Sequence, residues 1–317
     1  YANSKYSGLG PRGIAGGIAG GIAGDGAVIS YCYNSGSIGA DSTPSRFSST
    51  VSVGGIAGRS SGTIEDSKNV GKISTTSTTE ESGVGEISGG VGGITGEAGT
   101  VRRCCNYGEI LSSNNLSNSG VSVGGIAGFV GYKPILQCCN HGTVTGIQNV
   151  DERNTAVNVG GVVGMLGRET ILDCCYNTGM VTIEYHGTKT RYAGACGGIY
   201  VGSAKSCAYC YNVGELKVTS DYSKIGGIQG LGNADNADAL EYCYALNVYD
   251  APYAIEMSDA ESKLKETYEG FDFENVWAID PAINDGRPYI ASIPNDDDEN
   301  WYSNNNIMVS LPSSSYK

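Results

Sequence analysis

Small and β-branched apolar residues recur in fixed columns along most of this chain. Aligning its segments on a repeated Asn places one column four residues after that Asn: Ile38, Ile73, Ile110, Val144, Val181 and Leu216. A second column lies five residues before it: Ile29, Ile64, Val101, Ile135, Leu172, Cys207 and Leu240. Such residues suit a buried, pleated sheet, and no segment keeps the 3.6-residue apolar period of a helix. The pattern therefore predicts short strands.

Two motifs join these columns into one repeating unit. The first is Gly-Gly followed by Ile or Val, as at residues 53–58, and the second centres on Asn34, Asn69, Asn106, Asn140, Asn177 and Asn212. Consecutive Asn copies lie between 34 and 37 residues apart, a period typical of stacked solenoid rungs. We expect an all-β parallel β-helix of about seven rungs of roughly 35 residues, with three short strands per rung. The preference of β-crossovers predicts right-handed coiling.

The cysteines fall mostly into one column, two residues before the Asn: Cys32, Cys104, Cys138, Cys175, Cys210 and, in a shifted last copy, Cys243. Equivalent positions on successive rungs stack about 4.8 Å apart, farther than the Cβ atoms of a disulfide. We therefore expect a ladder of buried free thiols, and leave open a disulfide between off-column residues such as Cys174 or Cys196. Zinc needs four converging ligands, which a linear ladder with only two histidines lacks, so neither metal nor cofactor is expected.

Two further columns are interpreted as structural. The Asn residues could stack as an amide ladder, each side chain bonding the turn above or below it. The glycine two residues after each Asn suits a corner that needs positive φ. The segments that link one rung to the next vary most in length, and they are polar, as in residues 75–88, 112–122, 146–158 and 186–195. We expect these segments to protrude as loops from one side of the stack.

The repeat stops after Tyr249, which divides the chain into a β-helix domain (1–249), a C-terminal cap (250–293) and a polar acidic tail (294–317). Within the cap, Ser258 and Glu261 fit a capping box and predict a short helix. An aromatic cluster around Trp277 and a turn at residues 284–286 follow. The acidic run at 296–299 lacks the spacing of a calcium loop, which favours a solvated linker.

Charge excludes several classes of partner. With 20 basic and 33 acidic residues the net charge is −13, and such a surface repels nucleic acid and anionic lipid. No apolar run approaches the roughly 18 residues that a spanning helix needs. The sequence has neither an initiator Met nor a signal peptide, so we expect a mature or trimmed fragment whose signal or anchor segment lies elsewhere.

The paired motifs VGGIAG and CYNxGxV closely resemble the GLUG-motif repeats of bacterial surface and secreted proteins, common in gut anaerobes. The resemblance covers residues 20–244, and the stretch 271–289 looks like the segment that often closes such arrays. GLUG repeats also occur in the stalks of immunoglobulin A1 proteases, where a separate metallopeptidase domain does the chemistry; this chain has no His-Glu-x-x-His motif. The resemblance implies an extracellular or cell-surface location, and an anaerobic source would suit eleven unpaired thiols.

Three functions remain open. The first is a non-enzymatic adhesin, stalk or binding module, directed toward glycans or host or cell-surface proteins. The second is a carbohydrate-active enzyme, a polysaccharide lyase or glycosidase, with candidates Asp151, Glu152 and Arg153, or Glu184 with His186. The third is glycan binding without cleavage through tyrosine faces, for which the candidate residues are Tyr33, Tyr176 and Tyr211. Alternatively, these tyrosines form an outer aromatic ladder that stabilises the stack.

Overall fold

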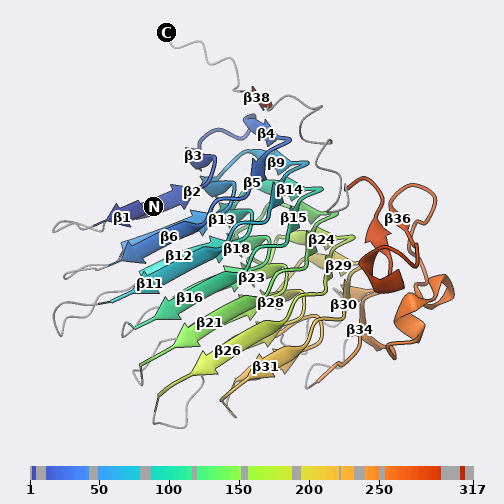
Figure 1. The fold of residues 1–317 in the computed structure, drawn as a ribbon. Coiled ribbons are helices and arrows are strands. Elements are labelled where there is room, and N and C mark those ends of the chain that lie inside the picture. The colour runs from blue at the N-terminus through green and yellow to red at the C-terminus, as the bar shows by residue number, and fades with distance from the viewer. Residues whose placement is uncertain are drawn as a thin grey trace.

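The chain stacks short parallel strands into a solenoid (Figure 1). The computed structural model describes residues 2–4, 12–42, 49–78, 87–115, 120–150, 156–187, 194–220, 223–231, 240–249, 254–293 and 308–310. Within these ranges the structure is all-β, with helical turns confined to short 3-10 elements. The expected fold class, an all-β parallel solenoid, is confirmed. No helix in the described ranges has the length and apolar character needed to cross a bilayer.

Each complete rung has five strands, where the sequence predicted three. The second rung contains β7 (Ser49–Gly54), β8 (Ala57–Ser60), β9 (Thr63–Glu65), β10 (Lys68–Asn69) and β11 (Ile73–Ser77). The Gly-Gly-Ile motif is not one strand, because the chain bends at Gly55 and Ile56 between β7 and β8. A second bend separates β9 from β10. These corners divide two of the expected strands.

Equivalent strands of successive rungs form five sheets, here named A to E. Sheet A contains β1 (Ala2–Ser4), β6 (Ile38–Ser42), β11, β16 (Ile110–Asn114), β21 (Val144–Gln148), β26 (Val181–Tyr185) and β31 (Leu216–Val218). Sheet B contains β2 (Arg12–Gly16), β7, β12 (Ile87–Gly92), β17 (Gly120–Gly124), β22 (Ala156–Gly160), β27 (Ala195–Gly197) and β32 (Lys224–Gly226). Sheet C contains β3 (Ala19–Ile22), β8, β13 (Thr95–Ala98), β18 (Ala127–Val130), β23 (Val163–Leu166) and β28 (Tyr200–Gly202).

The other two sheets are longer. Sheet D contains β4 (Val28–Ser30), β9, β14 (Thr100–Arg102), β19 (Ile135–Leu136), β24 (Ile171–Asp173), β29 (Ser206–Ala208), β33 (Leu240–Glu241) and an antiparallel β38 (Met308–Ser310) beside β4. Sheet E contains β5 (Tyr33–Asn34), β10, β15 (Cys105–Asn106), β20 (Cys139–Asn140), β25 (Tyr176–Asn177), β30 (Tyr211–Asn212), β34 (Tyr244–Ala245) and β35 (Ile255–Glu256). Because the sheets hold six to eight strands, the expected count of seven rungs describes only sheets A and B.

The register between rungs follows the alignment of the sequence copies. In sheet E, Asn34 pairs with Asn69, and each later ladder Asn pairs with the next one along the stack. Asn212 pairs with Ala245, which takes the seventh place in the column. The apolar columns are equally in register, since Ile73 pairs with both Ile38 and Ile110. Stacking like on like buries each column on the same face of every rung.

The solenoid interior has two separate cores. The column five residues before the Asn and the thiol column lie in the first core, with the Ile of the Gly-Gly-Ile motif. The column four residues after the Asn lies in the second core, between sheets A and B. The Asn column packs against the second Gly of the motif, because a Cβ on Gly55 would lie 2.5 Å from the Asn69 amide oxygen. Glycine is therefore required there for close approach.

The glycine after each Asn also serves close approach, and the expected positive φ is wrong at this position. A Cβ on Gly142 would lie 2.1 Å from the Gly108 carbonyl oxygen of the preceding rung. The positive φ falls instead three residues before the Asn, at the bend between sheets D and E, at Tyr31, Asp66, Arg103, Gln137, Cys174, Tyr209 and Tyr242. The left-handed corner thus comes earlier in the rung, at residues that are not glycine.

Replacing Gly142 by alanine is expected to destabilise the fold by about 1–3 kcal/mol, because the new methyl group meets backbone that cannot move away. Gly36 holds the same place in the first rung, yet among the described residues a Cβ there would meet only Asn34 Oδ1, at 3.6 Å. Gly36→Ala should therefore change stability by less than about 0.5 kcal/mol. Chemical denaturation of both variants measures the difference, and equal losses would contradict this account.

The C-terminal segment, residues 254–293, begins with β35 of sheet E, and the rest of it lies beside the stack, shown in orange and red in Figure 1. The capping box forms, since Glu261 Oε2 accepts from the Ser258 backbone N–H at 2.7 Å. However, the predicted cap helix is not confirmed: two 3-10 turns follow, η2 (Glu261–Lys263) and η3 (Lys265–Thr267). Leu264 between them is extended, with φ −106° and ψ 129°, and this interrupts the helix.

The rest of this segment packs sideways on the solenoid. A two-stranded antiparallel pair, β36 (Trp277–Ala278) and β37 (Tyr289–Ile290), flanks a third turn, η4 (Asn284–Gly286). Its apolar side chains share a third core with the outward-facing aromatics of sheet E. The segment therefore covers the flank of the last rungs. The acidic run at 296–299 lies outside the described residues.

Candidate functional site

The Asn column forms a continuous amide ladder. The Nδ2 of Asn34 donates to Asn69 Oδ1 at 2.6 Å, and the same bond repeats at 2.7–2.8 Å up to Asn212. Each Nδ2 also donates to the carbonyl oxygen two residues on, as from Asn140 to Gly142 at 2.8 Å. From Asn69 to Asn212 these residues are at most 2 % exposed. With their donors used within the stack, these side chains hold the rungs together.

The thiol column is buried. Cys32, Cys104, Cys138, Cys175, Cys210 and Cys243 are all free and buried. In mid-stack, the Cys138 thiol donates to the Leu136 carbonyl oxygen at 3.3 Å. Burial raises the pKa of the Cys138 and Cys175 thiols well above the ordinary value. Because the thiolate is the reactive form, these mid-stack residues act as small hydrophobes.

A disulfide joins Cys105 and Cys139, which corrects the expectation of eleven unpaired thiols. These residues directly precede a ladder Asn on adjacent rungs, and their Cα atoms lie 4.7 Å apart. The spacing of stacked backbones did not exclude a bond, because side chains on neighbouring strands can lean together. Cys174 and Cys196, for which a disulfide was left open, are free and buried. The feature of the sequence that could have predicted the disulfide is the presence of a cysteine at the same position in two consecutive copies of the repeat.

Two of the three candidate tyrosines are buried, which contradicts their assignment as ligand-binding faces. Tyr176 and Tyr211 are 3 % and 0 % exposed. Their rings stack at 5.1 Å, and Trp277 of the C-terminal segment lies 5.9 Å from each. The Tyr211 hydroxyl donates to the Pro288 carbonyl oxygen. The outer aromatic ladder is therefore the surface on which the C-terminal segment packs.

Tyr33, the third candidate, lies at the opposite end of sheet E and is 43 % exposed. It is separated from Tyr176 by three intervening strands of the sheet. The three tyrosines thus do not form one ligand surface. The sequence could not show this, since nothing in the repeats marks which part of the column another segment covers.

Of the candidate catalytic residues, Asp151, Glu152 and Arg153 lie outside the described residues. Glu184 and His186 are brought together, with His186 Nε2 3.3 Å from Glu184 Oε2. Their side chains are 40 % and 56 % exposed, and His186 Nδ1 lies 2.8 Å from Asn149 Oδ1 on the preceding rung. Such solvated neighbours are typical of a polar surface ladder rather than of a shaped catalytic cleft.

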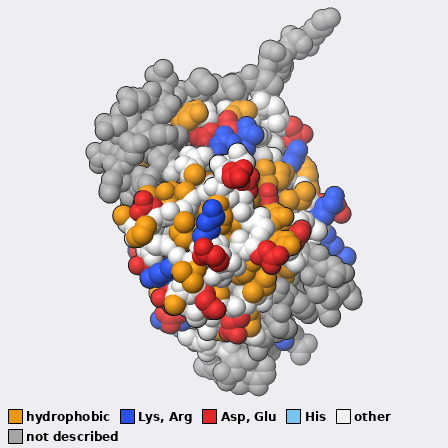
Figure 2. Space-filling model, turned by 90° about the vertical axis from the view of Figure 1, so that its right-hand side faces the viewer, with side chains coloured by type: hydrophobic (Ala, Val, Ile, Leu, Met, Phe, Trp, Pro, Cys, Tyr) orange, Lys and Arg blue, Asp and Glu red, His pale blue; other side chains and the backbone are white. Residues whose placement is uncertain are grey.

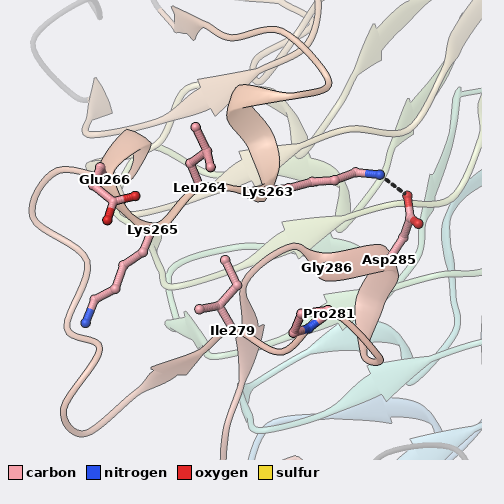
Figure 3. A pocket seen from close by; sticks show the side chains of 8 residues that line it. All are labelled: Lys263, Leu264, Lys265, Glu266, Ile279, Pro281, Asp285 and Gly286. Carbon is pink, nitrogen blue, oxygen red and sulfur yellow. Dashed lines mark hydrogen bonds and ion pairs between the residues drawn. The ribbon is translucent and has the colours of Figure 1, made fainter.

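The C-terminal segment carries a groove of 510 Å³ (Figure 3). Its lining residues are Lys263, Leu264, Lys265, Glu266, Ile279, Pro281, Asp285 and Gly286. Leu264 is 51 % exposed and supplies an apolar contact beside Ile279. Lys263 Nζ lies 2.9 Å from Asp285 Oδ2, drawn as a dashed line in Figure 3. Apolar contacts flanked by charges of both signs are the composition of a small recognition site.

The Asp285 carboxylate at this groove accepts hydrogen bonds from two basic side chains. Hydrogen bonds from Lys263 and then Arg287 hold the pKa of Asp285 below its ordinary value. The carboxylate is therefore ionised at neutral pH and suited to accept hydrogen bonds, not to act as a general acid. Figure 2 shows the flank of the molecule that faces right in Figure 1, where acidic, basic and hydrophobic side chains alternate without a field of one sign.

Metal-ligating side chains converge at two places in the described part of the chain. One comprises Cys105, Cys139 and His141, the other Cys207, Cys210 and Cys243. The disulfide occupies both sulfur atoms of the first group. The second group consists of free thiols and was not predicted, since no metal was expected from the sequence. The feature of the sequence that could have indicated this cluster is Cys207, the one cysteine in the otherwise aliphatic column five residues before the Asn.

Comparison with solved structures shows a likeness in fold. No family model matches the sequence, and no curated protein matches it. It is similar in structure to a crystal structure from Bacteroides ovatus described as a "putative immunoglobulin A1 protease", with a TM-score of 0.52 and 18 % sequence identity. The match covers 80 % of this chain and 77 % of that one. At this identity the likeness shows a shared fold.

Proposed function

We propose that this chain is a non-enzymatic, extracellular or cell-surface binding module of the GLUG-repeat type, directed toward glycans or proteins of a host or another cell. The observation that carries the proposal is the use of the repeat's polar columns for structure. The ladder amides bond one another and most thiols are buried. Tyr176 and Tyr211 are covered. A solenoid built in this way offers an extended surface for binding.

We assign ligand contact to the groove on the C-terminal segment. It combines an exposed Leu264 with Lys263, Lys265, Glu266 and Asp285, and it sits on a body held to the stack by a large aromatic core. The extracellular assignment is supported by the GLUG resemblance and by the Cys105–Cys139 disulfide, because such bonds persist in oxidising compartments.

The alternative of a carbohydrate-active enzyme has weaker support. Glycoside hydrolysis needs two carboxyl groups about 5–9.5 Å apart flanking a bound sugar. Glu184 is paired with His186 on an exposed surface, and the immunoglobulin A1 protease description belongs to a protein that is 18 % identical. The absence of His-Glu-x-x-His from this sequence removes the basis for carrying a metalloprotease activity over.

The assignment predicts that Leu264→Asp weakens binding by about tenfold or more, as expected when a central apolar contact is replaced by a charge. The assay is retention of the full chain on arrayed glycans and on immobilised extracellular proteins. Phe129 is the control, since it is 41 % exposed on sheet C and does not line the groove. Phe129→Asp should leave binding unchanged. Binding that survives Leu264→Asp, or that is lost equally in both variants, would remove the groove from the proposal.

A further inference from the structure

Three thiols converge inside the first core at the C-terminal end of the stack. Cys207 Sγ lies 3.7 Å from Cys243 Sγ, and the sulfur atoms of Cys207, Cys210 and Cys243 all lie within 4.8 Å of one another. All three residues are at most 2 % exposed. The convergence is local, because Cys207 is flanked in its column by Leu172 and Leu240. Rungs with an aliphatic residue there lack the third sulfur.

A second departure from the repeat points to the same place. Tyr200 pairs with Val163, and the preceding residues of that column are Ala127, Thr95 and Ala57. The tyrosine is 0 % exposed, and its hydroxyl has no hydrogen-bond partner among the described residues. It shares the first core with the three cysteines. A buried hydroxyl without a partner is costly, so it indicates an acceptor that the protein alone does not supply.

We propose that Cys207, Cys210 and Cys243 bind one thiophilic d10 cation, Zn²⁺ or Cu(I), and that the Tyr200 hydroxyl donates to one of the coordinating sulfurs. Binding is acid–base chemistry without electron transfer. Each coordinating thiol gives up its proton to solvent as its sulfur bonds the cation. With Zn²⁺ and three thiolates the site carries one net negative charge, a water molecule completes the four ligands that zinc needs, and Tyr200 keeps its proton. This proposal is independent of the proposed binding function.

The distances suit this class of ligand. Zinc–sulfur bonds of about 2.3 Å in tetrahedral geometry place two sulfurs about 3.8 Å apart, close to the 3.7 Å between Cys207 and Cys243. The backbone N–H of Cys175 donates to Cys210 Sγ at 3.3 Å. Such a hydrogen bond, from a residue that does not itself bind the metal, stabilises a thiolate. Cys243 gives a weak S–H bond to the Cys207 carbonyl oxygen at 3.3 Å. Coordination would replace this bond with a much stronger one.

The location gives the site a structural purpose. The amide ladder ends at Asn212, because Ala245 follows it in the column. Cys243 belongs to that last rung, whereas Cys207 and Cys210 belong to the rung before it. A bound cation would therefore link two rungs at the point where the amide bonds stop, and where the end of the stack is nearest for entry of the ion.

The test is metal binding by the full chain with the Cys105–Cys139 disulfide intact. Co²⁺ as a spectroscopic probe should give sulfur-to-cobalt charge-transfer absorption at one equivalent, displaced by Zn²⁺, and a Cu(I) arm separates the two cations. Tyr200→Phe should weaken Zn²⁺ binding by about 10- to 100-fold, as for other outer contacts, and Cys207→Leu by more. Cys196→Val is the matched control. Cys196 is buried in the second core and pairs with Val159, so this variant should bind like the wild type.

A second measurement on the wild type does not depend on a folded variant. Zn²⁺ should slow alkylation of Cys207, Cys210 and Cys243 together, read by mass spectrometry in mild denaturant, and leave Cys138 unchanged. Three results would overturn the proposal: no cation bound by the wild type, binding that persists in Cys207→Leu, or isolation of the chain with two of the three sulfurs in a disulfide. Binding that follows Cys105 and Cys139 instead would assign the metal to the other cluster.

Discussion

Trp277→Ala is expected to release the C-terminal segment from sheet E, at a cost of about 3–5 kcal/mol. The indole is 2 % exposed, lies 4.7 Å from the Phe271 ring, and contacts Tyr176 and Tyr211 on the stack. Removing it opens a cavity in the third core, which the stack and the C-terminal segment share. Denaturant unfolding followed by limited proteolysis should show early loss of residues 254–293, while the rungs remain protected.

The control for this variant is Phe273→Ala. Phe273 is only partly buried at the edge of the same core, with its ring centroid 6.4 Å from that of Phe271. Its loss should cost about 1 kcal/mol and leave the segment attached, since partly exposed side chains contribute less than central ones. If both variants lose the same stability, or if Trp277→Ala leaves the segment protected, the sideways packing described above is contradicted.

The second large effect is expected in the middle of the amide ladder. Asn140→Ala removes a bond from Asn106, one to Asn177 and one to the Gly142 carbonyl oxygen, all fully buried. The remaining partners are left without their donor or acceptor, and each such group costs about 1–3 kcal/mol. We expect a total loss of about 3–5 kcal/mol in the free energy of unfolding, measured by chemical denaturation.

Asn34→Ala is the matched variant at the open end of the ladder. Asn34 donates to Asn69 and to Gly36, receives no bond from a preceding Asn within the described ranges, and is 7 % exposed. Its replacement should cost about 1 kcal/mol, the ordinary net contribution of a hydrogen bond. A loss as large as that of Asn140→Ala would mean that position in the ladder does not matter, and that the amides act singly.

Stacking explains why so much of the fold was predictable from sequence. Each rung pairs with the next in register, so the same residue types must recur at the same depth, and Ile73 lies between Ile38 and Ile110. The predicted number of strands per rung was wrong because glycine occurs both in strands and in bends, so the sequence does not show that the chain turns at Gly55. The corner at Cys174 and its equivalents was missed because a positive φ at a residue that is not glycine leaves little trace in composition.

The site was less predictable because it depends on contacts between distant segments. Nothing in the repeats indicates that Trp277 packs on Tyr176 and Tyr211, so two tyrosines that looked available for a ligand are buried. The disulfide and the three-thiol cluster did leave signals. Cys105 and Cys139 share a place in consecutive copies, and Cys207 interrupts an aliphatic column. Each departure from the repeat marked a place where the molecule differs from a plain stack.

The central claim, that this chain binds and does not catalyse, is tested most directly by product analysis. The full chain is incubated with a panel of neutral and acidic polysaccharides and with immunoglobulin A1, and the masses of all components are followed over time. The account predicts retention of at least one partner with every mass unchanged. Fragments that accumulate with the wild type and are absent with Glu184→Gln would contradict it and assign the chemistry to the Glu184–His186 pair.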